Sequence, residues 1–337
     1  MMLGPGPREM VVSDLNEPVP GSDEVLIKVA ACGICGTDLS LYHGSPALIG
    51  EMRPSFPLVL GHEFAGEVVG RGAGVKDLEL GDWVTVNPHL YCGSCGACLR
   101  GEEEICSNRP IISFHRPGGA AEYVAVRARN AYPLPRLAAE AVGALGEPLA
   151  VAMHAVERVP PAPDDRVLII GAGPIGLLIG VACQEAGCGS LLLSGLAEDA
   201  PRLRIAEGLG ITTAVAGPEL EEVVRSDGGV DLVFDAAGSA ASLAAGLELL
   251  RAGGRLSALG IPPGAVPIDL ANIILAEKSV IGTRGYTPRT WKDAVALLSK
   301  RTSELMTIVS HRVALEDYEK AMAMLEAREG SKIFLVP

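Results

Sequence analysis

Aromatic residues and positive charge are both scarce in this sequence. Aromatic side chains make up 4% of its 337 residues, so it lacks the stacking platforms that bind single-stranded nucleic acid. Lys and Arg number 28 against 41 Asp and Glu, and the formal net charge is −13. This charge repels phosphate backbones and anionic lipid surfaces, so neither nucleic acid nor a membrane is an expected partner.

Long hydrophobic segments are also few. The N-terminal stretch MMLGPGPREMVV contains no apolar core of signal-peptide length, which predicts a cytoplasmic protein. Residues 167–184 carry no charge and approach the length of a short membrane-spanning helix, about 17 residues. Pro174 and four glycines interrupt this segment, so a strand, a turn and a helix describe it better than a span.

Cysteine is rare too, but half of the eight cysteines crowd into residues 91–108, at Cys92, Cys95, Cys98 and Cys106. Thiols stay reduced in a cytoplasm, so this cluster predicts a metal site rather than disulfides. Four thiolates complete the tetrahedral shell of zinc and leave no open position, which is typical of a structural site.

Three other interpretations of the cysteine cluster are weaker. An iron–sulfur run has a shorter last gap, followed by proline, whereas seven residues precede Cys106 and Ser107 follows it. A redox CxxC pair would not need four cysteines. Four unligated thiols would not need this regular spacing.

A second set of possible metal ligands is spread along the first half of the chain. Cys35, His62, Glu63 and Glu147 offer sulfur, nitrogen and oxygen atoms, and zinc with three protein ligands and one exchangeable position is the catalytic pattern. No local spacing shows that these residues meet, and Cys32 competes with Cys35. Taken singly, Cys35 is better explained as a buried core thiol and His62 as a hydrogen-bonded loop histidine.

A glycine-rich turn follows the apolar run at residues 167–170 and precedes a helical pattern. Its G-x-G-x-x-G spacing predicts a dinucleotide site, because the backbone can approach a pyrophosphate at the N-terminus of the helix. The residues expected to contact the cofactor lie in three places. The glycine turn contributes Gly171, Gly173, Pro174, Ile175 and Gly176. The end of the next strand contributes Gly195, Asp199 and Arg202, and the end of a later strand contributes Gly260.

The length of the chain and its hydrophobic pattern predict two domains of α/β type. Strand and helix patterns alternate from the glycine turn to about residue 285, which predicts a doubly wound parallel sheet. The proline-rich residues 159–165 mark the approach to it. Beyond it we expect amphipathic helices near 289–300 and 315–328 and a final strand, KIFLV.

Several motifs together resemble the zinc-dependent medium-chain alcohol dehydrogenases, and most of all their sorbitol and threonine (polyol) group. They are CGICGTD (32–38), GHEFAGEVV (61–69), the four-cysteine loop, GGAAEYV (118–124), EPLAVAMHA (147–155), the glycine turn and GGRLSALG (253–260). The resemblance covers nearly the whole chain. It departs at Ser40, where threonine dehydrogenases have histidine.

The resemblance implies a GroES-like, mostly β catalytic domain over residues 1–150, with the structural zinc lobe at 91–108. A Rossmann NAD(P)-binding domain would follow at 151–285, and residues 286–337 would return to the catalytic domain. The active site would lie in a cleft between the domains. The chain is also expected to form a homo-oligomer, a dimer or tetramer.

Roles for individual residues follow from the same resemblance. Cys35 and His62 would hold a catalytic zinc, and Glu63 or Glu147 would complete its coordination, directly, by exchange or through water. Thr37 matches the hydroxyl that relays the alcohol proton. His43 is either a second relay group or a surface residue, and Arg284 either reaches the substrate or is an ordinary surface arginine.

The implied reaction is hydride transfer between a secondary alcohol and NAD(P), with zinc polarising the substrate oxygen. The substrate would be a polyol, cyclitol or amino alcohol. One rival is a non-catalytic dinucleotide-binding scaffold or sensor on the same fold. The other is a zinc-independent quinone or enoyl reductase, against which the ligand candidates and the cysteine lobe argue.

The choice of cofactor depends on the end of the second strand of the nucleotide domain. NAD sites of this type carry an acid about 20 residues past the glycine turn, but Gly195 stands nineteen residues after Gly176. The missing acid and the nearby Arg202 and Arg204 favour NADP, or use of both cofactors. In the alternative, a longer loop brings Asp199 back onto the ribose.

Overall fold

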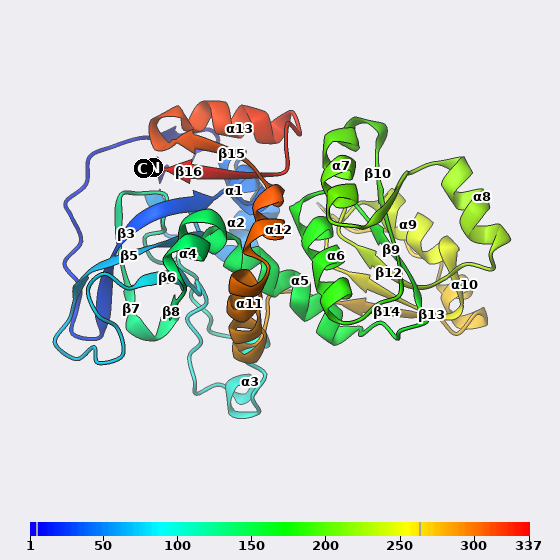
Figure 1. Cartoon of the computed structure of the whole chain (residues 1–337), viewed down its shortest axis with the longest axis horizontal. Coiled ribbons are helices and arrows are strands. Elements are labelled where there is room, and N and C mark those ends of the chain that lie inside the picture. The colour runs from blue at the N-terminus through cyan, green and yellow to red at the C-terminus, as the bar shows by residue number, and fades with distance from the viewer. Residues whose placement is uncertain (5, 263) are drawn as a thin grey trace. The chain divides into compact units, whose positions relative to one another are not determined.

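The computed structural model describes residues 1–4, 6–262 and 264–337. The chain divides into two compact units, Met1–Glu147 with Thr287–Pro337, and Pro148–Tyr286. We call them unit 1 and unit 2. Figure 1 colours the chain from one end to the other, and the last segment, in orange and red, lies with the blue N-terminal segment in unit 1.

Unit 1 is built around a mixed seven-stranded sheet with the order β15-β16-β3-β5-β6-β8, in which β7 also pairs with β3. β15 and β16 are parallel, and the other pairs are antiparallel. The strands are β3 (Glu24–Gly33), β5 (Glu63–Arg71), β6 (Trp83–Val86), β7 (Tyr123–Arg127), β8 (Ala131–Pro133), β15 (Val309–Ala314) and β16 (Lys332–Val336).

A small antiparallel sheet and short helices complete unit 1. The small sheet has the order β2-β1-β4. Its strands and the helices are β1 (Met2–Leu3), β2 (Met10–Val11), β4 (Leu58–Val59), α1 (Gly36–Tyr42), α2 (Pro46–Met52), α3 (Gly96–Leu99), α4 (Arg136–Val142), α11 (Pro288–Lys300), α12 (Thr302–Leu305) and α13 (Tyr318–Glu326). Helix α5 (Gly146–Arg158) begins at the end of the first segment of this unit.

The core of unit 1 fills the space between the sheets and α13. Val25, Ile27 and Val29 of β3 belong to this core, which is the period-2 spacing of one face of a strand. On the other face of β3, Lys28 is exposed but Leu26 is buried. The buried tail strand β16 adds Ile333 and Leu335 to the same core.

Unit 2 is a six-stranded sheet with the order β11-β10-β9-β12-β13-β14, and every pair in it is parallel. In chain order this is 3-2-1-4-5-6, the doubly wound order of dinucleotide-binding domains. The strands are β9 (Arg166–Ile170), β10 (Ser190–Gly195), β11 (Thr212–Val215), β12 (Val230–Asp235), β13 (Leu250–Ala258) and β14 (Ser279–Gly282).

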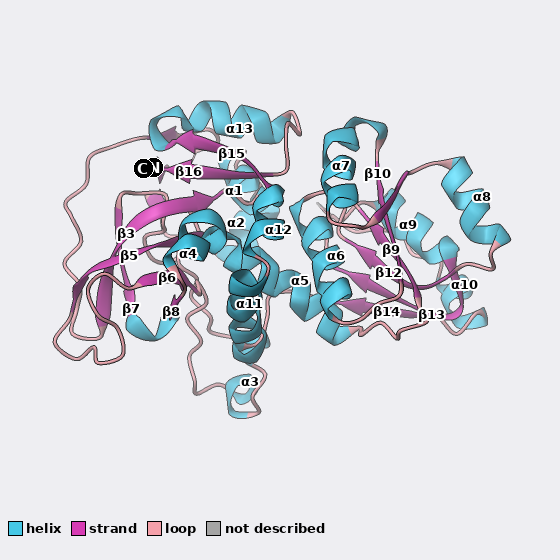
Figure 2. Ribbon diagram, in the orientation of Figure 1, coloured by secondary structure: helices cyan, strands magenta, loops and turns pink. Residues whose placement is uncertain are grey.

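Helices cover both faces of this sheet, as Figure 2 shows in cyan around the magenta strands. They are α6 (Pro174–Glu185), α7 (Ala200–Gly208), α8 (Pro218–Ser226), α9 (Ala240–Leu249) and α10 (Leu270–Leu275). Ser239 is the N-cap of α9, and its hydroxyl accepts a bond from Ser242 N at 3.0 Å.

The predicted α/β fold class is confirmed, and the uncharged segment 167–184 is a strand, a turn and a helix. Within the described residues, no helix combines the length and the apolar character that crossing a membrane requires.

Candidate functional site: two metal clusters and a dinucleotide turn

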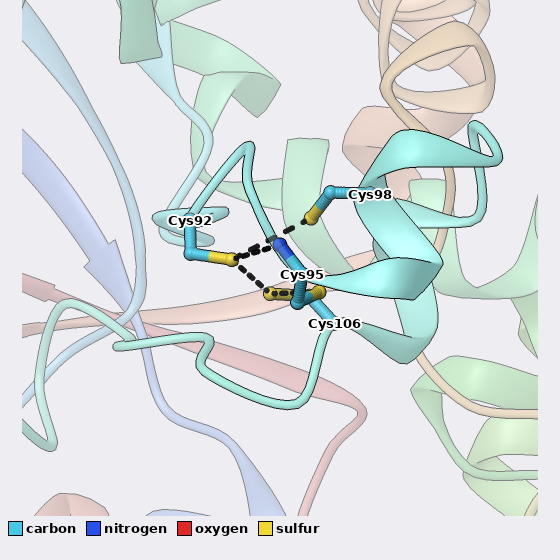
Figure 3. Close-up of side chains that lie close together, drawn as sticks. All are labelled: Cys92, Cys95, Cys98 and Cys106. Carbon is cyan, nitrogen blue, oxygen red and sulfur yellow. Dashed lines mark hydrogen bonds between the residues drawn. The ribbon is translucent and has the colours of Figure 1, made fainter.

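The four cysteines of the loop converge on one point (Figure 3). Their sulfur atoms are separated by 3.9 Å between Cys92 and Cys98, 3.8 Å between Cys95 and Cys106, and 3.5 Å between Cys106 and Cys92. A tetrahedron of sulfurs around zinc with bonds of about 2.3 Å has edges of about 3.8 Å. A disulfide would bring two sulfurs to about 2.05 Å. The cluster therefore fits a zinc ion.

The backbone of this lobe is shaped around the cluster rather than around an apolar core. Of the four cysteines, Cys106 is buried and the other three are half-buried, while Leu99 and Ile105 are 75% and 61% exposed. Gly93 and Gly101 take φ values of +71° and +77°, which glycine adopts without strain. Backbone groups of Cys98 and Ser107 lower the pKa of Cys95 to about 5, whereas burial raises the pKa of Cys98 to about 12, so a metal ion that binds four thiolates displaces protons from part of the cluster.

A second cluster brings together Cys35, His62 and Glu63, whose ligand atoms all lie within 4.8 Å of one another. Strand pairing explains why distant parts of the sequence meet here. Cys35 follows the end of β3, Glu63 begins β5, and Gly33 of β3 pairs directly with Glu63 in the antiparallel register. The ends of two adjacent strands thus present sulfur, nitrogen and oxygen donors to one point, as a catalytic zinc requires.

Asp38, which the sequence did not single out, supports this cluster from the first turn of α1. Its Oδ2 accepts a bond from Cys35 N at 2.9 Å, and its Oδ1 lies 3.6 Å from His62 Nδ1. The Asp38 and His62 side chains are both buried. A carboxylate behind a histidine is the arrangement that orients a metal-binding imidazole and leaves its other nitrogen for the metal.

The negatively charged groups around His62 suit the binding of a metal cation. Burial alone lowers the pKa of His62, but Asp38 and then Cys35 outweigh it and raise that pKa well above its usual value. His62 Nδ1 and Asp38 Oδ1 are buried without a hydrogen-bond partner among the described residues. A metal ion at this point would bind deprotonated ligands and compensate their negative charge.

Thr37 and Glu147 lie in unit 1 with the second cluster. The Thr37 hydroxyl is 3.1 Å from Cys35 Sγ, so a proton-carrying group stands next to a metal-binding atom. Glu147 lies in the first turn of α5, where burial raises its pKa to about 7. Its negative charge contributes to the raised pKa of His62, which places it in the electrostatic surroundings of that histidine.

Three other sequence candidates lie outside the cluster. The His43 ring Nε2 is 2.8 Å from Glu326 Oε1 on α13, and both side chains are partly exposed. Arg284 is exposed and belongs to unit 2. Cys32 is buried against Gly61, since a Cβ added to Gly61 would lie 2.3 Å from the Cys32 sulfur.

The glycine turn of unit 2 has the backbone of a dinucleotide cradle. Gly171 takes a φ of +111°, and a Cβ added to Gly176 would lie 1.9 Å from the Gly171 carbonyl oxygen, so helix and turn approach closely. Gly173 caps α6 and precedes Pro174 and Ile175, and a Cβ added to it would meet nothing within 4 Å. That open space at a helix N-terminus fits a pyrophosphate.

Two further strand ends border this turn. At the end of β12, Asp235 Oδ1 accepts bonds from Ala237 N and Gly238 N at 3.0 and 3.2 Å. Gly260, just beyond β13, packs so closely on Gly238 that a Cβ added to Gly260 would lie 2.2 Å from Gly238 N. Both features keep the backbone tight at the carboxyl edge of the sheet, where such folds bind ligands.

The end of β10 carries no acid. Gly195 is its last residue, and a Cβ added there would lie 2.9 Å from the Ala172 Cβ. Asp199 is buried, with Oδ2 accepting a bond from Leu196 N and Oδ1 one from Arg202, each at 3.0 Å. The Asp199 carboxylate is thus engaged within its own turn.

Comparisons with known proteins agree with these sites. The family described as alcohol dehydrogenase GroES-like domain matches residues 21–136, and the family described as zinc-binding dehydrogenase matches residues 174–300. A sorbitol dehydrogenase from Halalkalibacterium halodurans is 32% identical, over 98% of this chain and 97% of its own length. An L-threonine 3-dehydrogenase from Pyrococcus furiosus is 36% identical, over 95% and 93%.

A solved structure from Sinorhizobium meliloti, bound to NADP, superposes with a TM-score of 0.90 at 33% identity, covering 99% of this chain and 97% of that one. The two clusters thus fit zinc, the glycine turn fits a nicotinamide dinucleotide, and the match extends along the chain. The chain belongs to the zinc-binding medium-chain alcohol dehydrogenase family.

Proposed function

We propose that this chain oxidises a secondary alcohol group of a polyol, cyclitol or amino alcohol with NAD(P), and catalyses the reverse reduction. The observation that carries the proposal is the convergence of Cys35, His62 and Glu63 beside the Thr37 hydroxyl. The substrate class is supported by the sorbitol and L-threonine 3-dehydrogenases to which the chain is similar.

Each residue has a distinct task in this proposal. Cys35 and His62 would hold zinc together with Glu63, while Glu147 is the alternative or exchanging oxygen ligand. The zinc supplies a Lewis acid that polarises the substrate oxygen. Thr37 carries the proton of the hydroxyl group away, and Asp38 fixes the orientation of the His62 ring. His43 has no task here, because Glu326 holds its ring.

The proposal is tested by metal analysis together with a substrate screen. The purified chain should contain two zinc ions, one for each cluster, and should reduce NAD or NADP with members of a panel of polyols, cyclitols and amino alcohols. A non-catalytic scaffold would contain one zinc, in the cysteine lobe. A chain with a single zinc and no activity on the panel would contradict the proposal.

We also propose that the cofactor is NADP, or that both cofactors are used. The absence of an acid at Gly195 removes a hydrogen bond to the ribose of NAD and a repulsion of the 2′-phosphate of NADP. The engagement of Asp199 with Leu196 and Arg202 supports this, because its carboxylate already has partners.

The ratio of kcat/KM for the two cofactors tests this preference. We expect NADP to be at least as efficient as NAD, whereas a preference for NAD above roughly tenfold, or ~1.4 kcal/mol, would overturn the proposal. Asp199→Asn locates the cause. If Asp199 held the ribose, the variant would lose efficiency with NAD alone. We expect the variant to change kcat/KM by the same factor with NAD and with NADP.

A homo-oligomer in the cytoplasm completes the proposal. Within the described residues, β14 pairs with a strand on one side only, and α10, which precedes β14 in the chain, exposes apolar side chains, with Ile274 at 64% and Leu275 at 85%. An open strand edge and exposed apolar residues both suit pairing with a second copy. Sedimentation equilibrium tests it, and a monomer at micromolar concentration would contradict it.

A further inference from the structure

Lys332 is a buried lysine at the first position of β16. It is 3% exposed, and its ammonium group contacts the Oε2 atom of Glu63, which is 1% exposed. A buried charge is costly unless a partner compensates it, so these two side chains depend on each other. The partner of Lys332 is thus one of the three residues of the second metal cluster.

Gly33 makes room for this ion pair. It lies on β3 between the two strands that supply the charges, paired with Glu63 on one side and with Phe334 on the other. A Cβ added to Gly33 would lie 2.2 Å from Glu63 Oε2 and 2.9 Å from Lys332 Cε. The two side chains therefore meet over the one residue of this part of β3 that has no side chain.

The backbone on the lysine side is fixed by hydrogen bonds. Ile34 N donates to the Ile333 carbonyl at 3.0 Å, which ties the end of β3 to β16. The Ser310 hydroxyl donates to the Lys332 carbonyl at 3.1 Å and accepts from Ser331 N at 2.9 Å. The Lys332 ammonium group thus extends from a rigid strand, so it can define where the Glu63 carboxylate lies.

We propose that Lys332 is a positioning residue that holds the Glu63 carboxylate beside Cys35 and His62, and that Gly33 provides the space in which it does so. The inference rests on the proposed zinc function of that cluster. Without a cation next to it, Glu63 would be buried as an unpaired charge close to the Cys35 sulfur. With Lys332 in place, the ligand set is assembled before a metal ion arrives.

The direct test is the zinc affinity of the full-length chain, measured by competition with a chromophoric chelator. Lys332→Met should weaken zinc at the second cluster by about 10–100-fold, the usual cost of losing a group that orients a ligand. Lys332→Arg, which keeps the charge, should recover part of the loss. Gly33→Ala should also weaken zinc, although it removes no charge.

Two matched controls separate this effect from general damage. Lys28→Met removes an exposed lysine from β3, the strand that contains Gly33. Gly50→Ala adds a Cβ where nothing lies within 4 Å. Both should bind two zinc ions as the wild type does. The zinc in the cysteine lobe should remain in every variant and serves as an internal reference.

A double-mutant cycle tests the coupling itself. If Lys332 acts through Glu63, then Lys332→Met should change zinc affinity less than about twofold in a Glu63→Gln background. The inference is wrong if Lys332→Met lowers the melting temperature but leaves zinc affinity unchanged, or if its effect is equally large without Glu63. A wild-type chain with one zinc would instead remove the proposed function.

Discussion

His62→Ala should lower kcat/KM by about three orders of magnitude or more. The substitution removes a buried ligand from the cluster of Cys35, His62 and Glu63, and the polarisation of the substrate oxygen by a metal ion contributes several kcal/mol to such reactions. Zinc content should fall from two ions per chain to one. Steady-state kinetics and metal analysis of the same preparation measure both effects.

Dinucleotide binding is the internal control for this variant. The glycine turn belongs to unit 2 and the His62 cluster to unit 1, so titration of NAD(P)H fluorescence should give nearly the wild-type dissociation constant. His43→Ala is the matched histidine variant and should retain most activity, because the His43 ring is bound to Glu326. Activity of His62→Ala above a few per cent would count against metal-assisted chemistry.

Local patterns in the sequence predicted the nucleotide half of the fold well. The apolar strand, the glycine turn and the helix at 166–185 form one continuous segment, and the predicted alternation continues after it with helices at Ala200–Gly208 and Ala240–Leu249. The short strand β11 and the polar helix α8 carry the weakest signals in this half of the sequence. In β11 no residue is buried, so it carries no apolar run, and α8 buries only Leu220 and Val224.

The pairing of strands in unit 1 could not be predicted in the same way. Its sheet joins β3 to β16, near the other end of the chain, and no local pattern encodes a register between segments so far apart. A continuous apolar run such as KIFLV indicates a buried strand but not its neighbours. Only the family resemblance predicted that residues 286–337 return to the catalytic domain.

The two metal clusters also differ in whether local spacing in the sequence predicts that their ligands meet. The four cysteines lie within fifteen positions, so their spacing alone predicts a common ligand. Cys35 and His62 meet only through the pairing of β3 with β5, which spacing does not reveal.

The supporting residues Asp38 and Lys332 were missed, although each left a signal. Asp38 stands three residues after Cys35, in the first turn of α1. Lys332 is the one charge at the head of the apolar strand KIFLV.

Cys98→Ser should release the zinc of the cysteine lobe and unfold residues 91–108. A serine hydroxyl is a poor replacement for a thiolate ligand, and the lobe has little else to order it, since Leu99 and Ile105 are exposed and α3 spans four residues. We expect one zinc ion per chain and rapid proteolysis within the lobe. A loss of about 3 kcal/mol would lower the melting temperature of a domain of this size by roughly 6–12 °C.

The control for this variant is Cys188→Ser, which changes a half-buried cysteine of unit 2 whose sulfur donates to the Ser190 carbonyl. It should keep two zinc ions and resist proteolysis like the wild type. The remaining zinc of Cys98→Ser should be the ion at Cys35 and His62, so the lobe and the catalytic cluster would lose metal independently. A Cys98→Ser chain that keeps both zinc ions and melts like the wild type would show that the lobe does not depend on a closed zinc site.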